Sequence, residues 1–343
     1  MKLMSIISAL LGLFAGSSQA DLNVAEFAAL LSEGKAALVD VRTAEEYSAG
    51  HIPGATNIDF NSADFIELFK ASVPKDCPVA VYCRTGKRSG EASAALVKAG
   101  YNVNNLIGGY QAWTDAGRPV NVYPVERFYS DSNLPIDITL IKHGTLAFSF
   151  KGKWIHVDPV TEHGKPTDYG AEFPKADAIL ITHEHGDHLD EVAINLLSND
   201  NTRLVMNHKS WDKIGHGVVM ENGETGNLPG RVIIFAVPAY NTTKGRENFH
   251  PKGNGNGYVL FFDGFRVYVA GDTEFIPEMA ELEDIDVAFL PVNQPYTMTV
   301  DQCVTAARII TPKVLIPYHF SQTDLSELPS RLPGIKVLLR DMK

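Results

Sequence analysis

The chain has 343 residues, more than the roughly 100 to 200 of one ordinary domain, so we expect two domains. Hydrophobic residues make up 45% of the chain and charged residues 21%, which is the balance of a globular protein with an ample core. The formal net charge of −11 excludes a strongly basic surface, so we expect neither nucleic acid nor an anionic membrane surface as a partner.

The first twenty residues have the three parts of a secretory signal: Lys2 near the start, an apolar run over 3–15 and the small-residue sequence Ser18-Gln19-Ala20. We therefore expect residues 1–20 to be a signal peptide, cleaved before Asp21, and the mature protein to be exported to the periplasm. A buried first helix is the alternative. The apolar run is too short to span a bilayer and no other run approaches that length, so no integral membrane segment is expected after cleavage.

The segment that follows alternates helices and strands. Asn23 is an N-cap candidate for a short amphipathic helix, and a strongly apolar strand ends at Tyr82. The expected elements are a helix over 24–31, a strand over 37–41, a helix over 63–70, a strand over 78–82 and a helix over 89–99. This alternation predicts a small α/β layer with a parallel sheet.

Cys83 stands at a strand end, in a loop that precedes a helix N-terminus. Converging backbone amides and the helix dipole favour a thiolate there, and Arg84 and Arg88 add positive charge for an anionic sulfur donor. Cys77 and Cys303 have no such surroundings, and Cys303 lies in a probable core helix. Because the chain has three cysteines, an odd number for an exported protein, at least one is expected to stay free.

Three stretches together resemble the rhodanese family over about residues 21–120. They are Asp40-Val41-Arg42 with Gly50-His51-Ile52-Pro53-Gly54-Ala55, the Cys83 loop, and Gly108-Gly109-Tyr110-Gln111-Ala112-Trp113. The resemblance implies a sulfurtransferase in which Cys83 carries a persulfide beside Arg84 and Arg88, with a low-molecular-weight sulfur donor and acceptor as partners. The alternative is a binding-only module that keeps the fold, and the retained cysteine and arginines favour a competent site.

Turn formers mark a boundary after this domain, at Pro119, Pro124 and Pro135. We expect a linker over 121–134 and a second domain over 135–343. The first strands of that domain are expected as a meander over 136–141, 146–150 and 154–157.

The strongest signal in the chain is the sequence His183-Glu184-His185-Gly186-Asp187-His188, which follows an apolar run over 178–182. The run predicts a buried strand, and α/β proteins place ligands at such strand ends. His183 and His185 project the same way in an extended chain, and the glycine lets the chain turn so that Asp187 and His188 face the same point. Imidazoles and a carboxylate without thiolate suit Zn²⁺, Mn²⁺ or Fe²⁺. A metal site is predicted, with a solvated polar loop as the alternative.

This stretch resembles the HxHxDH signature of the metallo-β-lactamase superfamily, and the resemblance covers roughly residues 135–343. Three later strands also end in candidate ligands, at His250, Asp272 and His319. The resemblance implies an αββα sandwich of the lactonase and phospholipase-like branch. The implied ligands are His183, His185 and His250 for one ion, Asp187, His188 and His319 for a second, and Asp272 as a bridge.

Other polar residues have weaker signals. Asp158, between Val157 and Pro159, is a candidate acceptor behind a metal-bound imidazole, since ligating histidines need one. Isolated histidines are more often surface or core residues than ligands. We interpret six in this way: His51, which belongs to the rhodanese-like signature, and His143, His156, His163, His208 and His216.

Two cations suit hydrolysis, because together they lower the pKa of a bridging water and hold the oxyanion of a carbonyl or phosphoryl centre. We therefore expect a dinuclear hydrolase that acts on a small molecule, and the branch that the sequence resembles implies the lactone, amide or phosphodiester class. Zinc is the first candidate for the two divalent ions, with manganese or iron next, and Asp272 is a candidate catalytic residue. One alternative is persulfide oxidation at a single iron, because the two folds also occur together in persulfide dioxygenases. A non-enzymatic persulfide or metal carrier is the other.

Overall fold

The computed structural model describes residues 17–164 and 166–342. Residues 1–16, and with them most of the expected signal peptide, lie outside the described residues. Gln19 and Ala20, the last residues of that expected peptide, form the start of the first strand and pair with Val103 and Asn104. None of the helices in the described ranges has the length and apolar content that crossing a bilayer requires.

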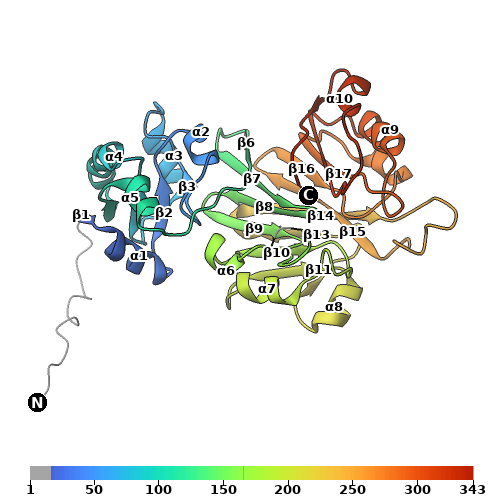
Figure 1. Cartoon of the computed structure of the whole chain (residues 1–343), viewed down its shortest axis with the longest axis horizontal. Coiled ribbons are helices and arrows are strands. Elements are labelled where there is room, and N and C mark those ends of the chain that lie inside the picture. The colour runs from blue at the N-terminus through green and yellow to red at the C-terminus, as the bar shows by residue number, and fades with distance from the viewer. Residues whose placement is uncertain (1–16, 165, 343) are drawn as a thin grey trace, which may run out of the picture.

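Five parallel strands form the sheet of the N-terminal part, in the order β1, β5, β4, β2, β3 (Figure 1). The strands are β1 Gln19–Leu22, β2 Ala37–Asp40, β3 Thr56–Asn57, β4 Val79–Tyr82 and β5 Val103–Leu106. The helices are α1 Val24–Ser32, α2 Ala44–Ser48, α3 Phe65–Ser72, α4 Lys87–Lys98 and α5 Gly109–Asp115. Phe69 and Leu96 pack α3 and α4 on one face, while Phe27, Tyr47 and Trp113 pack α1, α2 and α5 on the other. The predicted parallel α/β layer is confirmed.

Helix starts follow the capping residues that the sequence provides. Asn23 caps α1, Thr43 caps α2 and Thr299 caps a helix of the C-terminal part. In each case the side chain three positions on reaches back to the cap, which satisfies two backbone donors at once. Each such cap contributes about 1 kcal/mol to helix stability.

Two seven-stranded sheets form the C-terminal part, in the orders β12-β11-β10-β9-β8-β7-β6 and β13-β14-β15-β16-β17-β18-β19. The first sheet contains β6 Val125–Tyr129, β7 Pro135–Lys142, β8 Thr145–Phe150, β9 Lys153–Val157, β10 Ala178–Ile181, β11 Arg203–Met206 and β12 Val218–Val219. The second contains β13 Thr225–Leu228, β14 Val232–Ala239, β15 Gly255–Phe262, β16 Phe265–Val269, β17 Val287–Pro291, β18 Val314–Tyr318 and β19 Lys336–Val337. The helices are α6 Tyr169–Glu172, α7 Glu191–Leu197, α8 His208–Ile214, α9 Val300–Ile310 and α10 Leu328–Arg331, with 3₁₀ turns at Pro229–Arg231 and Pro277–Glu281.

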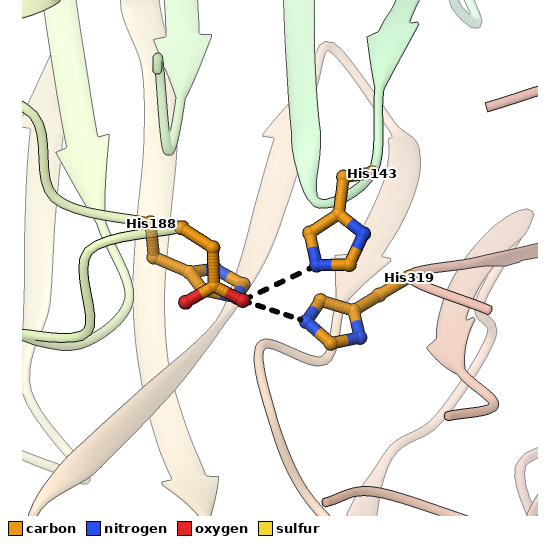
Figure 2. Close-up of side chains that lie close together, drawn as sticks. His143, His188 and His319 are labelled. Atoms are coloured by element: carbon orange, nitrogen blue, oxygen red, sulfur yellow. Dashed lines mark hydrogen bonds and ion pairs between the residues drawn. The ribbon is translucent and has the colours of Figure 1, made fainter. Parts of the chain in front are cut away.

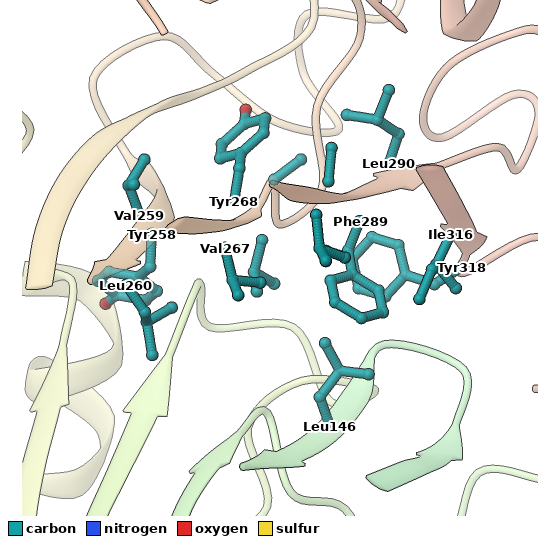
Figure 3. Packing of buried hydrophobic residues seen from close by; sticks show 14 of the residues in the cluster. Leu146, Tyr258, Val259, Leu260, Val267, Tyr268, Phe289, Leu290, Ile316 and Tyr318 are labelled. Atoms are coloured by element: carbon teal, nitrogen blue, oxygen red, sulfur yellow. The ribbon is translucent and has the colours of Figure 1, made fainter. Parts of the chain in front are cut away.

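The main core lies between these two sheets. Figure 3 shows Leu146 of the first sheet pointing toward Phe289 of the second. Ile194 of α7 packs in a separate cluster on the outer face of the first sheet, and Val304 of α9 packs against the second. The layers are therefore helix, sheet, sheet, helix, as the resemblance implied.

The segment expected as a linker, residues 121–134, contains the edge strand β6, which pairs antiparallel with β7. The first sheet therefore begins inside that segment rather than at residue 135. The strand gave little signal in the sequence because Glu126 and Arg127 interrupt its apolar residues, and most of it is only half-buried. Turn-forming residues flank the strand on both sides, and they led us to interpret the whole segment as a linker.

Arg127 ties the two parts of the chain together. Its guanidinium makes two hydrogen bonds of 2.6 Å to Asp137 on β7 and one of 2.6 Å to Asn57 of the N-terminal sheet. The same group lies 5.7 Å from the ring centroid of Tyr47. Because Asp137 is buried, this ion pair compensates the cost of removing its carboxylate from water.

We predict that Arg127→Met lowers the free energy of unfolding by about 3 kcal/mol, because it leaves the Asp137 carboxylate buried without a partner. Urea denaturation followed by fluorescence measures the change. Lys70→Met is the matched control, since Lys70 pairs with Glu67 on an exposed helix surface, where such pairs contribute less than about 1 kcal/mol. Equal unfolding midpoints for the two variants would contradict the prediction.

Candidate functional site

The predicted metal ligands lie at the ends of buried strands. His183, His185, Asp187 and His188 follow β10, whose four residues are all buried. In the second sheet β14, β16 and β18 run in the same direction, so their carboxyl ends share one edge. From that edge come His250 after β14, Asp272 after β16 and His319 after β18. The fold thus brings all seven predicted ligands to one place.

The first predicted triad, His183, His185 and His250, forms one compact group of ring nitrogens. Nε2 of His183 lies 3.0 Å from Nδ1 of His185. His250 is oriented from behind, because its Nδ1 lies 3.1 Å from the carbonyl oxygen of Tyr296. Its Nε2 is thereby left to face Asp272, whose Oδ2 is 3.2 Å away.

The second predicted triad also gathers around one point. Oδ2 of Asp187 lies 3.5 Å from Nε2 of His319 and 3.9 Å from Nε2 of His188. Asp272 approaches the same two rings, with Oδ1 3.4 Å from Nε2 of His188 and Oδ2 3.3 Å from Nε2 of His319. Ligands about 2.0 to 2.2 Å from a tetrahedral zinc ion lie about 3.3 to 3.6 Å from one another. Three of the four contacts have this spacing, and the fourth, between Asp187 and His188, is wider at 3.9 Å.

Unpaired polar atoms also indicate a cation. Nε2 of His188, His250 and His319 and Oδ1 of Asp272 are buried without a hydrogen-bond partner among the described residues. Leaving one such atom unsatisfied costs about 1 to 3 kcal/mol, so four at one point require an explanation. Nitrogen and oxygen donors without a thiolate fit zinc, manganese or iron.

Asp272 is ionised in this environment. Burial raises the pKa of its carboxyl group, but the neighbouring His319 and His188 imidazoles outweigh burial and hold that pKa well below its usual range. The buried carboxylate lies within 3.9 Å of both histidine groups. It therefore lies between the two groups of candidate ligand histidines.

Asp158 holds His188 from behind, as the sequence suggested. Its Oδ2 lies 2.8 Å from Nδ1 of His188, which leaves Nε2 of that ring facing Asp272. The backbone N–H and the hydroxyl of Thr182 donate to the same carboxylate at 2.7 and 2.6 Å. The aspartate thus fixes the orientation of one candidate ligand ring.

Two histidines that the sequence analysis interpreted as isolated lie beside the candidate metal ligands. His143 is buried in the turn between β7 and β8, with Nε2 3.2 Å from Oδ2 of Asp187. The ring of His163 contacts it at a tilt of 44°, with ring centroids 4.0 Å apart. Both line a pocket of about 390 Å³ over the ligands, together with Phe249, Tyr296 and other residues. The sequence carried one weak signal for His143, namely its position at a strand end on the ligand side of the sheet.

The other histidines interpreted as structural stay away from the centre. His51 stacks on Tyr47 in the N-terminal part, with ring centroids 3.8 Å apart. His156 is buried beside Trp154 and Phe173, and His208 pairs with Asp212 on the surface. His216 is exposed.

Cys83 lies at the end of β4 and before α4, as predicted. Its Sγ is 3.2 Å from the backbone nitrogen of Gly86 and 3.5 Å from the hydroxyl of Ser89, and both groups can donate to it. Arg84 is exposed beside it. Arg88 is part of the same loop and helix, but its guanidinium forms a 2.8 Å ion pair with Glu46.

The Gly108-Gly109 pair explains the shape of this loop. A Cβ atom on Gly109 would lie 2.3 Å from the carbonyl oxygen of Cys83, so only glycine allows this approach. The backbone N–H of Tyr110 then donates to that oxygen at 2.8 Å. The thiol loop is therefore braced by the third rhodanese-like stretch, which begins at Gly108.

Comparison with known families agrees with the fold. Residues 137–319 match the model of the beta-lactamase superfamily domain, and residues 23–116 match that of the rhodanese-like domain. The first match covers more than half of the chain. The chain belongs to the beta-lactamase superfamily and carries an N-terminal rhodanese-like domain, as both resemblances indicated.

Several relatives and solved structures are similar to about half or more of this chain. A metal-dependent hydrolase of Archaeoglobus fulgidus is 31% identical over 195 residues, which are 54% of this chain and 84% of the relative. The crystal structure of a metal-dependent hydrolase of Parabacteroides distasonis is 51% identical with a TM-score of 0.62, over 64% of this chain and 100% of that one. Igni18, a metallo hydrolase of Ignicoccus hospitalis, is 25% identical with a TM-score of 0.51, over 60% of this chain and 95% of that one.

We predict that Asp158→Asn weakens metal binding about 10- to 100-fold, because an amide cannot accept all three hydrogen bonds and His188 loses its fixed orientation. Competition with a chromophoric chelator measures the affinity. Asp168→Asn is the control, since Asp168 only caps the short helix α6. Unchanged metal affinity in a folded Asp158→Asn protein would refute the role assigned to Asp158.

Proposed function

We propose that this protein is a metal-dependent hydrolase whose centre holds two divalent ions, with zinc as the first candidate and manganese or iron next. The observation that carries the proposal is the position of Asp272. Its Oδ2 lies 3.2 Å from Nε2 of His250 in one triad and 3.3 Å from Nε2 of His319 in the other. One buried carboxylate is thus shared by two sets of ligands, and the metal-dependent hydrolases among the relatives support the same reaction type.

The two triads have separate tasks in this proposal. His183, His185 and His250 hold one ion, and Asp187, His188 and His319 hold the second. Two bound cations supply a nucleophilic water at neutral pH and stabilise the charge that develops on a carbonyl or phosphoryl oxygen. Asp272 lies between the triads, where its carboxylate can orient the attacking water.

The pocket supports a small-molecule substrate. Its volume of about 390 Å³ suits a compact ligand, and Phe249 and Tyr296 offer an aromatic wall. Asn293 and Ser321 add polar groups at the rim. We propose a lactone, an amide or a phosphodiester as the substrate, since each presents the electrophilic centre that such a site attacks.

The proposal predicts two metal ions per chain in fully loaded protein. Asp272→Asn should bind fewer than two and lose at least 100-fold in hydrolysis of model lactones, amides and phosphodiesters, because it weakens the shared ligand. Elemental analysis and kinetic assays measure both quantities. Asp212→Asn, at an exposed surface position, is the control and should match the wild type. If well-loaded protein holds a single iron and consumes O₂ when a persulfide is added, the hydrolase proposal is wrong and persulfide oxidation is the better assignment.

We also propose that the rhodanese-like domain is a sulfurtransferase with Cys83 as its nucleophile. The thiolate attacks the outer sulfur of a thiosulfate-like donor, the sulfur–sulfur bond of the donor breaks and sulfite leaves, so that Cys83 carries a persulfide. An acceptor such as cyanide then removes that sulfur as thiocyanate and restores the thiolate. Hydrogen bonds from Gly86 and Ser89 support an anionic sulfur at this position, and the exposed Arg84 is available to the anionic donor. Arg88 is half-buried and paired with Glu46, so it adds positive charge beside the loop from a fixed position.

Cys83→Ser should abolish sulfur transfer from thiosulfate to cyanide, because serine cannot form a persulfide, while hydrolysis at the metal centre persists. Thiocyanate formation and mass spectrometry of the persulfide measure the transfer. Cys77→Ser is the matched control, since Cys77 lies before β4 and outside the loop. Undiminished transfer in Cys83→Ser would rule out this nucleophile.

A further inference from the structure

We infer that His143 is a positioning residue that orients Asp187 and so controls binding of the second metal ion. The inference rests on the two-ion function proposed above and assigns a role to a histidine outside both triads. Nε2 of His143 lies 3.2 Å from Oδ2 of Asp187, which is the oxygen that faces His319 (Figure 2). Figure 2 shows His143 and His319 side by side, with dashed contacts from both rings to this carboxylate.

Asp187 is the candidate ligand that most needs such support. Its side chain is 30% exposed, whereas those of His188 and His319 are at most 2% exposed. Its contacts with described side chains are to three imidazoles, of which His188 and His319 belong to the same triad. His143 is therefore the contact that can hold the carboxylate in place without being one of the proposed ligands.

The hydrogen bond is compatible with metal binding by the same oxygen. A carboxylate oxygen has two lone pairs, so Oδ2 can accept from the N–H of His143 and still face an ion. Histidine with its proton on Nε2 supplies that donor. An oriented carboxylate loses less entropy on binding, and such supporting hydrogen bonds are worth about 10- to 100-fold in metal affinity.

The turn that carries His143 is fixed against both neighbouring ligands. The carbonyl oxygen of His143 accepts a hydrogen bond of 3.0 Å from the backbone N–H of His319. A Cβ on Gly144 would lie 2.8 Å from Cε1 of His188, so the turn packs directly against that ring. His143 itself has a φ of 45°, a left-handed conformation that persists only where surrounding contacts impose it. The ring is therefore held in position before any ion binds.

Two amide substitutions test this inference. Glutamine at His143 places an N–H donor near the position of Nε2, within reach of Asp187, whereas asparagine places its donor near Nδ1, too far to make the bond. Asparagine also tolerates the left-handed backbone at this position, so His143→Asn should keep the fold. Comparing the two variants therefore shows whether the hydrogen bond to Asp187 matters or whether any polar side chain at this position is enough.

Titration of metal-free protein with Zn²⁺ against a chromophoric chelator measures each binding step. Wild type should bind two ions. His143→Asn should bind the first with unchanged affinity and the second about 10- to 100-fold more weakly, and His143→Gln should restore the second to within a few-fold of wild type. His216→Asn is the control: this exposed histidine lies away from the centre, and the variant should keep both affinities.

Three results would overturn the inference, and they can be told apart. If His143→Asn binds each of the two ions as tightly as the wild type does, the hydrogen bond to Asp187 is not needed for metal binding. Loss of the second ion in both His143 variants, with an altered visible spectrum of the Co²⁺ form, would make His143 a direct ligand instead. A wild type that binds only one ion would refute the proposed two-ion function itself, and the role of His143 with it.

Discussion

The structure depends on the placement of one buried carboxylate, Asp272, among the imidazoles of four histidines. Their ring nitrogens lie 3.2 to 3.9 Å from its oxygens, in a region from which water is almost excluded. Burying charged and polar groups without partners is costly, and several donor atoms here have no hydrogen-bond partner within the described chain. The cost is acceptable only if a cation completes the site and the scaffold prevents the rings from turning away.

The scaffold meets that requirement with two sheets whose strands end beside the site. The backbone is strained at three residues around the centre, with a φ of 45° at His143, 47° at Asp158 and 45° at His319. Strain of this kind costs about 1 to 3 kcal/mol per residue and clusters at functional sites. The large core between the sheets, a single cluster whose members range from Leu134 to Met342, supplies the stability that allows it.

The thiol site and the metal site follow the same structural rule. Cys83 comes directly after the buried strand β4. His183 follows the buried strand β10, with Thr182 between them. Both strands lie inside parallel regions of their sheets, where the carboxyl ends open onto loops and neighbouring helix N-termini. Arg127 joins the two domains through Asn57 and Asp137, so the chain carries two reactive strand ends on domains that contact one another.

The local sequence was sufficient for features that depend on short-range order. The apolar runs before Cys83 and His183 identified buried strands, Asn23 identified a helix start, and the spacing of the histidines after β10 identified a candidate metal site. The edge strand β6 was missed, because the half-buried Arg127 is held by an ion pair with Asp137 rather than by apolar contacts, and no local pattern records that pairing. The role of His143 was missed for the same reason. Its neighbour Asp187 is 44 positions away, and their contact arises only when the first sheet assembles and brings the turn between β7 and β8 beside the loop after β10.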